Sequence, residues 1–328
     1  MRYFPELSLR DAGCLDALLS LRARAALGSD AAHRVEEDID AEPYRAWIRL
    51  SSPQAELRAG LQKLDFGQAT LLRPLMWFDR VDPRDSLGLT DGVYGLLARY
   101  YFLSNTRLWA WGLYGNGDPK GWEVFPSVET EPEYGGRLQT PLLGGEFGLS
   151  YHHRVAAVPQ GIAPAAPSSS TEAVENRLGL DARWDVLVGL WLETTVSRLA
   201  VPYGEALYTS LAMVGLDYTL DWGNGLYVLC EHLLARTGEH AFDSREANDV
   251  SAALVQYPVG LVDNVRCIVN YDWENGDWFR FVGWEKVYDD WSFHLNVFWN
   301  PEQRLLPGQP GSESFAGTGA QALVVFNH

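Results

Sequence analysis

The chain has 328 residues, of which 47% are hydrophobic and 12% aromatic, and its formal net charge is −17. This acidity argues against nucleic acid as a partner, because a nucleic-acid-binding surface needs concentrated basic charge. The sequence has no apolar run of about 18 residues, so we expect no helix to cross a bilayer. The three cysteines are far apart and show no metal-ligand spacing, and neither a metal nor another cofactor is predicted.

Apolar and polar residues alternate with a period of two along most of the chain, which is typical of β-strands with two different faces. The alternation predicts an all-β protein. Seventeen strands are expected in chain order, at 4–10, 15–27, 44–50, 55–66, 93–102, 107–114, 134–139, 145–155, 176–184, 187–198, 207–220, 225–236, 249–257, 264–273, 278–287, 291–299 and 316–327.

The segment from Val265 to Trp299 suggests what the outer face of the sheet contacts. It contains an Asn-Gly hairpin turn at 274–277, followed by a strand with Trp291 and Trp299 at the two ends of its apolar face. A strand that crosses a membrane places aromatic rings at the two interfaces and aliphatic residues between them. We therefore predict a transmembrane antiparallel β-barrel of about 16–18 strands.

The connections between the strands support this prediction, because short and long ones alternate. Short turns are expected at 11–14, 51–54, 103–106, 140–144, 185–186, 221–224, 258–263 and 288–290. The longer connections are 28–43, 67–92, 115–133, 156–175, 199–206, 237–248 and 300–315, and only 274–277 breaks the rule. Short periplasmic turns and long extracellular loops are the pattern of barrels in the bacterial outer membrane.

This alternation also bears on the N-terminus. The first visible strand is followed by a short turn, so it starts on the extracellular side. Single-chain bacterial barrels have an even number of strands, and the seventeen predicted here are an odd number. We therefore expect residues 1–328 to form a single barrel of eighteen strands from which an N-terminal strand and a signal peptide are missing.

The less apolar parity of the strands is expected to face the lumen, and it is rich in arginine. The lumen set is Arg22, Arg24, Arg45, Arg49, Arg58, Arg99, Arg177, Arg183 and Arg266. Basic rings favour anions in pores. The alternative is that these arginines pair with lumen acids such as Glu56, Asp181, Glu193 and Asp272 and only satisfy a polar interior.

The connection 67–92 is the longest and is too apolar and aromatic for a solvated loop. Loops of this length are often functional. We predict that 67–92 folds into the barrel as a constriction or plug; a cap packed on the rim is an equally good alternative. The charged residues expected near the narrowest point are Arg73, Asp79, Arg80, Asp82, Arg84 and Asp85.

Two pairs that suggest other chemistry are discounted. His152 and His153 are neighbours in a strand, so their side chains point to opposite faces and cannot bind one metal ion. Ser150 and His152 share a face, which would permit a hydrolase pair of the outer-membrane phospholipase type, but no third orienting group is identifiable. No catalytic residue is assigned, and the protein is not expected to be an enzyme.

The C-terminal segment, with Gly319, Ala322, Val324 and Phe326, resembles the assembly signal that ends bacterial outer-membrane barrels, although Phe326 is third from the end. Leu57 to Trp111 is similar to porin-like barrels of the alginate-export and uncharacterised-porin type, with a Phe-Gly strand end, an inserted segment with Pro and Asp, and an aromatic strand. This resemblance implies the outer membrane of a Gram-negative bacterium, with the lipid bilayer and lipopolysaccharide as partners.

The function predicted is a porin-like channel for passive diffusion of small solutes, with anions among them. Two alternatives stay open: an outer-membrane enzyme or closed structural or adhesion barrel, and a soluble aromatic-rich β-protein that binds carbohydrate. The sequence sets neither the solute nor the oligomeric state.

Overall fold

A computed structural model describes residues 2–10, 14–29, 35–159, 170–200, 207–243, 245–302 and 315–326. Within these ranges no helix is both long enough and apolar enough to span a membrane.

The described residues form a single 18-stranded sheet. Its strands are β1 (Arg2–Tyr3), β2 (Glu6–Arg10), β3 (Leu15–Ser29), β4 (Val35–Ser51), β5 (Ala55–Gln62), β6 (Val93–Tyr101), β7 (Arg107–Leu113), β8 (Glu133–Leu142), β9 (Gly145–Pro159), β10 (Ser170–Asp185), β11 (Gly189–Ala200), β12 (Leu207–Leu220), β13 (Leu226–Gly238), β14 (Glu246–Pro258), β15 (Asp263–Asp272), β16 (Asp277–Val287), β17 (Trp291–Trp299) and β18 (Thr318–Phe326).

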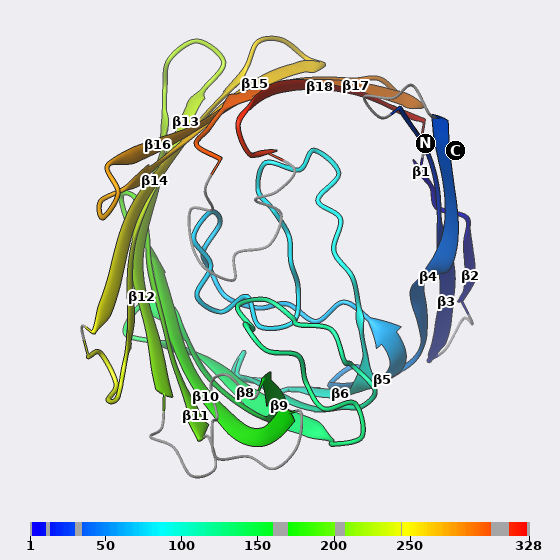
Figure 1. Ribbon diagram of the computed structural model, residues 1–328, viewed down its shortest axis with the longest axis vertical. Helices are drawn as coiled ribbons and strands as arrows, with labels where there is room; N and C mark the ends of the chain where they lie inside the picture. Colours follow the sequence, from blue (N-terminus) through cyan, green and yellow to red (C-terminus); the bar gives the residue numbers. More distant parts are fainter. Residues whose placement is uncertain are drawn as a thin grey trace.

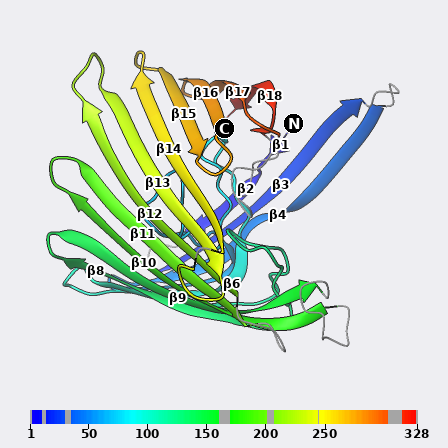
Figure 2. The same cartoon turned by 60° about the vertical axis from the view of Figure 1, so that its left-hand side comes forward.

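Each strand from β2 to β18 pairs antiparallel with the next one along the chain, and the sheet curls into a ring (Figure 1). The short strand β1 continues the edge of β3 beyond β2. Within the described residues no paired register joins β18 to β1 or β2, although the two chain ends lie close together in Figures 1 and 2.

Every one of the seventeen predicted segments contains a strand, so the predicted all-β antiparallel barrel is confirmed. Two predicted loops are largely strand instead. The acidic connection 28–43 is mostly the paired ends of β3 and β4, which form the long hairpin that projects in Figure 2, and 156–175 is shortened by the ends of β9 and β10. Backbone pairing between strands does not require apolar side chains, so the acidic composition of 35–42 did not indicate where the strands end.

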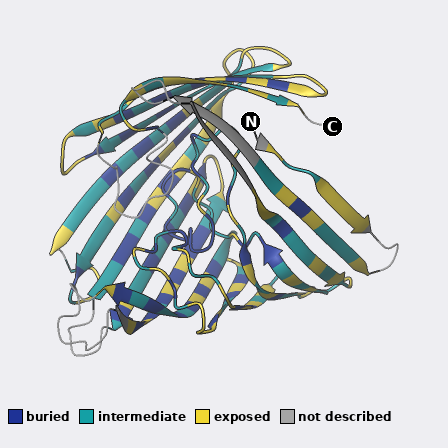
Figure 3. Cartoon of the chain, turned by 45° about the vertical axis from the view of Figure 1, so that its right-hand side comes forward, coloured by how far each residue is buried: buried dark blue, intermediate teal, exposed yellow. Residues whose placement is uncertain are grey.

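Exposed and buried residues alternate along the strands, as the bands in Figure 3 show. The pattern is complete in β17, where all five odd-numbered residues are exposed and all four even-numbered ones are buried. Trp291 and Trp299 lie on the exposed face with 45% and 39% exposure, and Leu295 lies midway between them at 45%. An apolar band between two aromatic positions is the surface that a bilayer covers.

This outer face gives a stability prediction. Leu295→Arg should destabilise the folded barrel by about 2–4 kcal/mol, because a charge at the bilayer midplane loses its hydration. Urea unfolding in lipid vesicles measures the change. Asp290→Arg is the control, since Asp290 lies in the turn between β16 and β17. Equal effects of the two substitutions would contradict a membrane-facing Leu295.

The interior differs from the expected polar lumen. Many inward residues of β12–β17 are apolar, and they form one buried cluster with Leu71, Leu72, Trp191 and Phe315. Its strand members are Leu211, Met213, Leu229, Leu233, Val250, Ala252, Leu254, Ile268, Phe279, Phe281 and Phe298. β12, β13, β14 and β16 therefore carry apolar residues on both faces, because much of their inner face packs against other segments of the protein instead of water. β15 and β17 keep mostly polar inward residues, with Ile268 and Phe298 as their members of the cluster.

Candidate functional site inside the ring of strands

The segment between β5 and β6, residues 63–92, runs inside the ring (Figure 1). Two buried carboxylates on the wall hold its first part. Glu193 on β11 accepts backbone N–H groups from Gln68, Ala69 (2.8 Å) and Leu75 (3.3 Å). Glu231 on β13 accepts those of residues 70, 71 and 72 at 2.7, 2.9 and 2.6 Å. Six backbone donors thus converge on two acidic side chains, which fixes the path of the segment against the wall.

Aromatic packing holds the middle of the segment. Trp77 is 1% exposed, and its indole N–H donates to Thr195 Oγ1 on β11 at 3.3 Å. It packs over Gly179 on β10, where an added Cβ would lie 2.9 Å from the indole ring. The second buried cluster joins the segment to β6 and β7 and consists of Leu64, Leu75, Trp77, Phe78, Val93, Leu97, Trp111 and Leu113.

The last part of the segment is held by polar contacts to β15 and β17. Arg266 on β15 donates to the carbonyl oxygens of Pro83 (3.3 Å) and Arg84 (3.2 Å). Asn296 on β17 donates to Ser86 Oγ at 3.0 Å. The segment therefore crosses the interior from β11–β13 to β15–β17 before it returns to β6.

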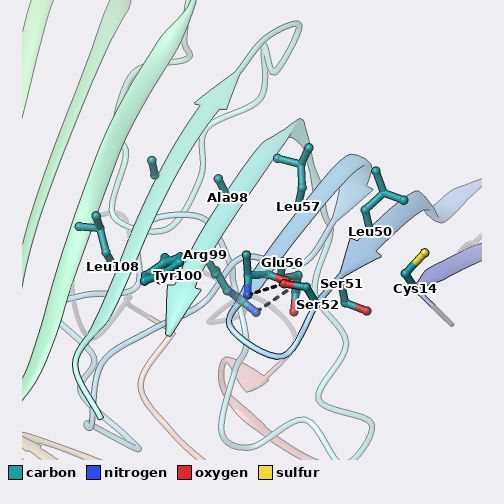
Figure 4. A pocket seen from close by; sticks show the side chains of 12 residues that line it. Cys14, Leu50, Ser51, Ser52, Glu56, Leu57, Ala98, Arg99, Tyr100 and Leu108 are labelled. Atoms are coloured by element: carbon teal, nitrogen blue, oxygen red, sulfur yellow. Dashed lines mark hydrogen bonds and ion pairs between the residues drawn. The ribbon is translucent and has the colours of Figure 1, made fainter. Parts of the chain in front are cut away.

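The predicted lumen arginines of β3–β6 lie on the inner wall, and two of them share one carboxylate. Arg58 and Arg99 both pair with Glu56, at 2.8 and 3.5 Å. Figure 4 shows Arg99 and Glu56 joined at the short-turn end of β5 and β6. Arg22 pairs with Glu42 and Asp91, and Arg49 with Asp16. The side chain of Arg24 lies outside the described residues.

The remaining predicted residues divide into paired and unpaired groups. Ion pairs join Arg73 to Asp79, Arg84 to Asp82, Arg177 to Glu123 and Glu175, and Arg183 to Asp185. Asp85 accepts the backbone N–H of residues 87 and 89. Within the part of the chain that is described, Arg45, Arg80 and Arg266 have no carboxylate within ion-pair distance.

Two of these arginines, Arg45 and Arg80, form hydrogen bonds with the same residue, Thr90. Arg45 on β4 donates to the carbonyl oxygen of Thr90 at 2.8 Å, and the backbone N–H of Arg80 donates to Thr90 Oγ1, also at 2.8 Å. Arg45 is buried and Arg80 is exposed. The Thr90 corner, defined as Arg45, Arg80 and Thr90, therefore brings together two arginines without a described carboxylate partner where the inner segment returns to the wall of β3–β6.

A buried ion network on β8–β10 was not predicted as a unit. Its cations are Lys120, Arg154 and Arg177, and its acids are Glu123, Glu133 and Glu175. Ligand atoms of Glu123, Glu133 and His152 lie within 4.8 Å of one another. Lys120 and the two arginines already neutralise these carboxylates, so the donor set fits an ion-pair network better than a metal site. The alternation in 145–155 places Arg154 on the inward face and could have indicated it as an interior residue. No pattern indicated its partners in the 115–132 connection.

Arg137 on β8 and Asp181 on β10 form a fully buried pair at 2.6 Å, with each side chain 1% exposed. Asp181→Ala should cost about 3–5 kcal/mol of unfolding free energy, because it leaves a buried guanidinium without its partner. Urea unfolding in vesicles tests this. Glu146→Ala, which removes the exposed partner of Arg107 at 3.9 Å, is the control and should have little effect.

The discounted pair Ser150 and His152 does not form a nucleophile and base. Ser150 Oγ accepts from Arg137 at 2.9 Å. Both ring nitrogens of His152 are occupied, Nδ1 by the indole N–H of Trp111 at 3.2 Å and Nε2 by Glu133 at 3.1 Å. Neither nitrogen is therefore available to accept a proton from Ser150.

A hollow of about 490 Å³ lies at the short-turn end of β4–β7 (Figure 4). Most of its lining is apolar and belongs to the outward parity, including Leu50, Leu57, Ala98 and Leu108. It is therefore part of the lipid-facing surface and is distinct from the interior that holds the inner segment.

A ring of antiparallel strands with an apolar exterior and an inserted segment defines the class of outer-membrane β-barrels. No family model and no curated protein matches the sequence. Solved structures do match the fold. The chain is similar to the anion-selective porin from Comamonas acidovorans, with a TM-score of 0.55, 11% identity, and coverage of 99% of this chain and 87% of that one.

Two further structures agree. Wzi of Escherichia coli, described as an outer-membrane protein involved in group 1 capsule assembly and a carbohydrate-binding β-barrel, gives a TM-score of 0.57 at 12% identity, covering 97% of this chain and 74% of its own. OccAB1 of Acinetobacter baumannii gives 0.53 at 8% identity, covering 99% and 93%. The protein thus has the fold of bacterial outer-membrane β-barrels, as its strand pattern predicted.

Proposed function

We propose that the protein spans the bacterial outer membrane as a restricted, porin-like channel through which small anionic solutes diffuse. The inner segment 67–92 narrows the passage, and the solute moves between this segment and the arginine-bearing wall of β3–β6. Passive diffusion needs no catalytic group and no cofactor.

The observation that carries this proposal is the uneven pairing of charge in the interior. Arg73, Arg84, Arg177 and Arg183 are neutralised in the ion pairs described above. Arg266 on β15 instead donates to backbone carbonyls of the inner segment, and the Thr90 corner keeps Arg45 and the exposed Arg80 without a carboxylate among the described residues. Arg58 and Arg99 also share a single carboxylate. This wall therefore holds arginines that no described carboxylate neutralises, although the whole chain carries −17. Fixed basic groups at a constriction raise the local anion concentration.

Reconstitution of the purified chain in planar bilayers tests the proposal. We expect discrete conductance steps and a reversal potential in a KCl gradient that has the sign of chloride permeation. The selectivity should weaken in concentrated salt, because the Debye length falls from about 10 Å at 0.1 M to about 3 Å at 1 M. Stable insertion, shown by heat-modifiable migration, without any conductance would contradict a channel.

A closed barrel that binds carbohydrate is the second candidate. The two apolar clusters in which the inner segment packs on the wall favour it, and Wzi is described as a carbohydrate-binding barrel. Under this alternative, cells that express the protein would retain capsular polysaccharide at their surface and purified protein would not conduct.

Three finer expectations stay predictions: the alginate-export type indicated by 57–111, contact with lipopolysaccharide, and the Gram-negative source. Alginate is a polyanion, so the first of these agrees with an anion path. Competition of alginate oligomers with chloride current in the same bilayers would test it.

A further inference from the structure

We infer that Ser292, His294 and Glu285 form a Ser-His-Glu hydrolytic triad on the inner wall near the short-turn rim, able to cleave short-chain carboxylic esters of water-soluble alcohols. The three side chains come from the neighbouring strands β16 and β17. This activity is separate from the proposed channel function.

The contacts match the roles of a triad atom by atom. Ser292 Oγ lies 2.9 Å from His294 Nε2. On the other side of the ring, His294 Nδ1 lies 3.6 Å from Glu285 Oε1. The nitrogen facing the serine is the one that takes its proton, and the nitrogen facing the acid is the one that the acid orients. The second distance is longer than a hydrogen bond, but such contacts are often loose before substrate binds.

The strand register produces this alignment. Ser292 and His294 are two residues apart, so they share a face, and Glu285 is the direct cross-strand partner of His294. Asn296 has the same parity and bonds to Ser86 of the inner segment, so the shared face is the inner one. The alignment is therefore fixed by the β-ladder and does not depend on a flexible loop.

The surroundings suggest the class of substrate. Ser292 and His294 are 7% and 6% exposed, whereas the Glu285 side chain is 42% exposed and Val287, the cross-strand neighbour of Ser292, is 45% exposed. Solvent therefore reaches the residues that flank the serine and the histidine. The register partners of the serine are Val287 and Val325. Val287 also lines a hollow of about 400 Å³ at the short-turn rim. Valine side chains beside the nucleophile suit a short aliphatic acyl group.

The reaction is an ordinary acyl transfer. Ser292 Oγ attacks the ester carbonyl carbon as His294 Nε2 takes its proton, and the alcohol leaves with that proton when the tetrahedral intermediate collapses. Water then releases the acyl group as a carboxylic acid by the same steps. The backbone N–H groups near Ser292 belong to strands paired on both sides, so few can stabilise an oxyanion. We therefore expect slow turnover and an acyl-enzyme that accumulates.

Covalent labelling tests the inference. The refolded full chain is treated with a fluorophosphonate probe, and its peptides are analysed by mass spectrometry; hydrolysis of p-nitrophenyl acetate is followed in parallel. We expect the label on Ser292, and its loss in Ser292→Ala and His294→Gln. Glu285 is a positioning residue. Glu285→Gln should slow labelling by at least about tenfold and change its pH profile, and Glu285→Asp should restore part of the rate.

A second serine–histidine pair supplies a matched control. Ser251 Oγ lies 2.9 Å from His232, but it contacts Nδ1 and also accepts from Trp273, and no carboxylate of the described ranges pairs with His232. Ser251→Ala should leave labelling and hydrolysis unchanged. Equal labelling of Ser292→Ala and the unsubstituted chain, or no labelled serine in a chain that migrates as folded, would overturn the inference. Ser292→Ala should conduct like the unsubstituted channel, so the outcome is independent of the proposed function.

Discussion

Replacing both anchoring carboxylates, Glu193→Gln and Glu231→Gln in one chain, should raise the single-channel conductance to that of a variant that lacks the inner segment. The carboxylates accept six backbone N–H groups from residues 68–72 and 75. A hydrogen bond to a charged group contributes about 1.5–3 kcal/mol, so neutralising both acceptors removes much of the free energy that holds the segment. Single-channel recording measures the result, and limited proteolysis within 67–92 reports the release directly.

Asp272→Asn is the matched control for this prediction. Asp272 is also a buried inward carboxylate that accepts backbone N–H groups, but its donors are residues 274 and 275 of a hairpin turn. We expect the Asp272→Asn variant to conduct like the unsubstituted chain. If the double variant released the segment to protease and still conducted like the unsubstituted chain, the segment would not be the constriction.

Arg80→Glu should abolish or reverse anion selectivity, which is the second large effect. Arg80 is exposed at the Thr90 corner, and its substitution changes the local charge by two units beside Arg45. Two unit charges about 4 Å apart interact by about 1 kcal/mol even in bulk water, and by more where the walls exclude water. The reversal potential in a KCl gradient should move toward that of potassium, and the shift should be largest at low salt.

Arg245→Glu provides the comparison, because it makes the same charge change in the exposed connection between β13 and β14, where Arg245 pairs with Glu239. Screening should leave the selectivity of this variant unchanged. A similar shift in both variants would mean that the net charge of the chain, and not the Thr90 corner, sets the ion preference.

The sequence indicated which residues face lipid but only partly what fills the interior. The alternation in 291–299 predicted the faces of β17 correctly, because the direction of a side chain from a strand depends only on its parity. The apolar cluster on the inner face of β12, β13, β14 and β16 was missed, although 207–220 and 225–236 carry apolar residues at both parities. Leu211 and Met213 share the inner parity, and this signal was available.

Sequence alone determined the order of the seventeen strands from β2 to β18, most of the two-sided connections and the apolar exterior, since each is a local property of the chain in a bilayer; the two-residue strand β1 was not predicted. Only the tertiary structure decided which charges stay unpaired and how the inner segment is held. Glu231 and its donors are about 160 residues apart in the chain, and the ring of strands brings them together. The same holds for Ser292, His294 and Glu285, because a shift of one residue in the register of β16 and β17 would put Glu285 on the opposite face.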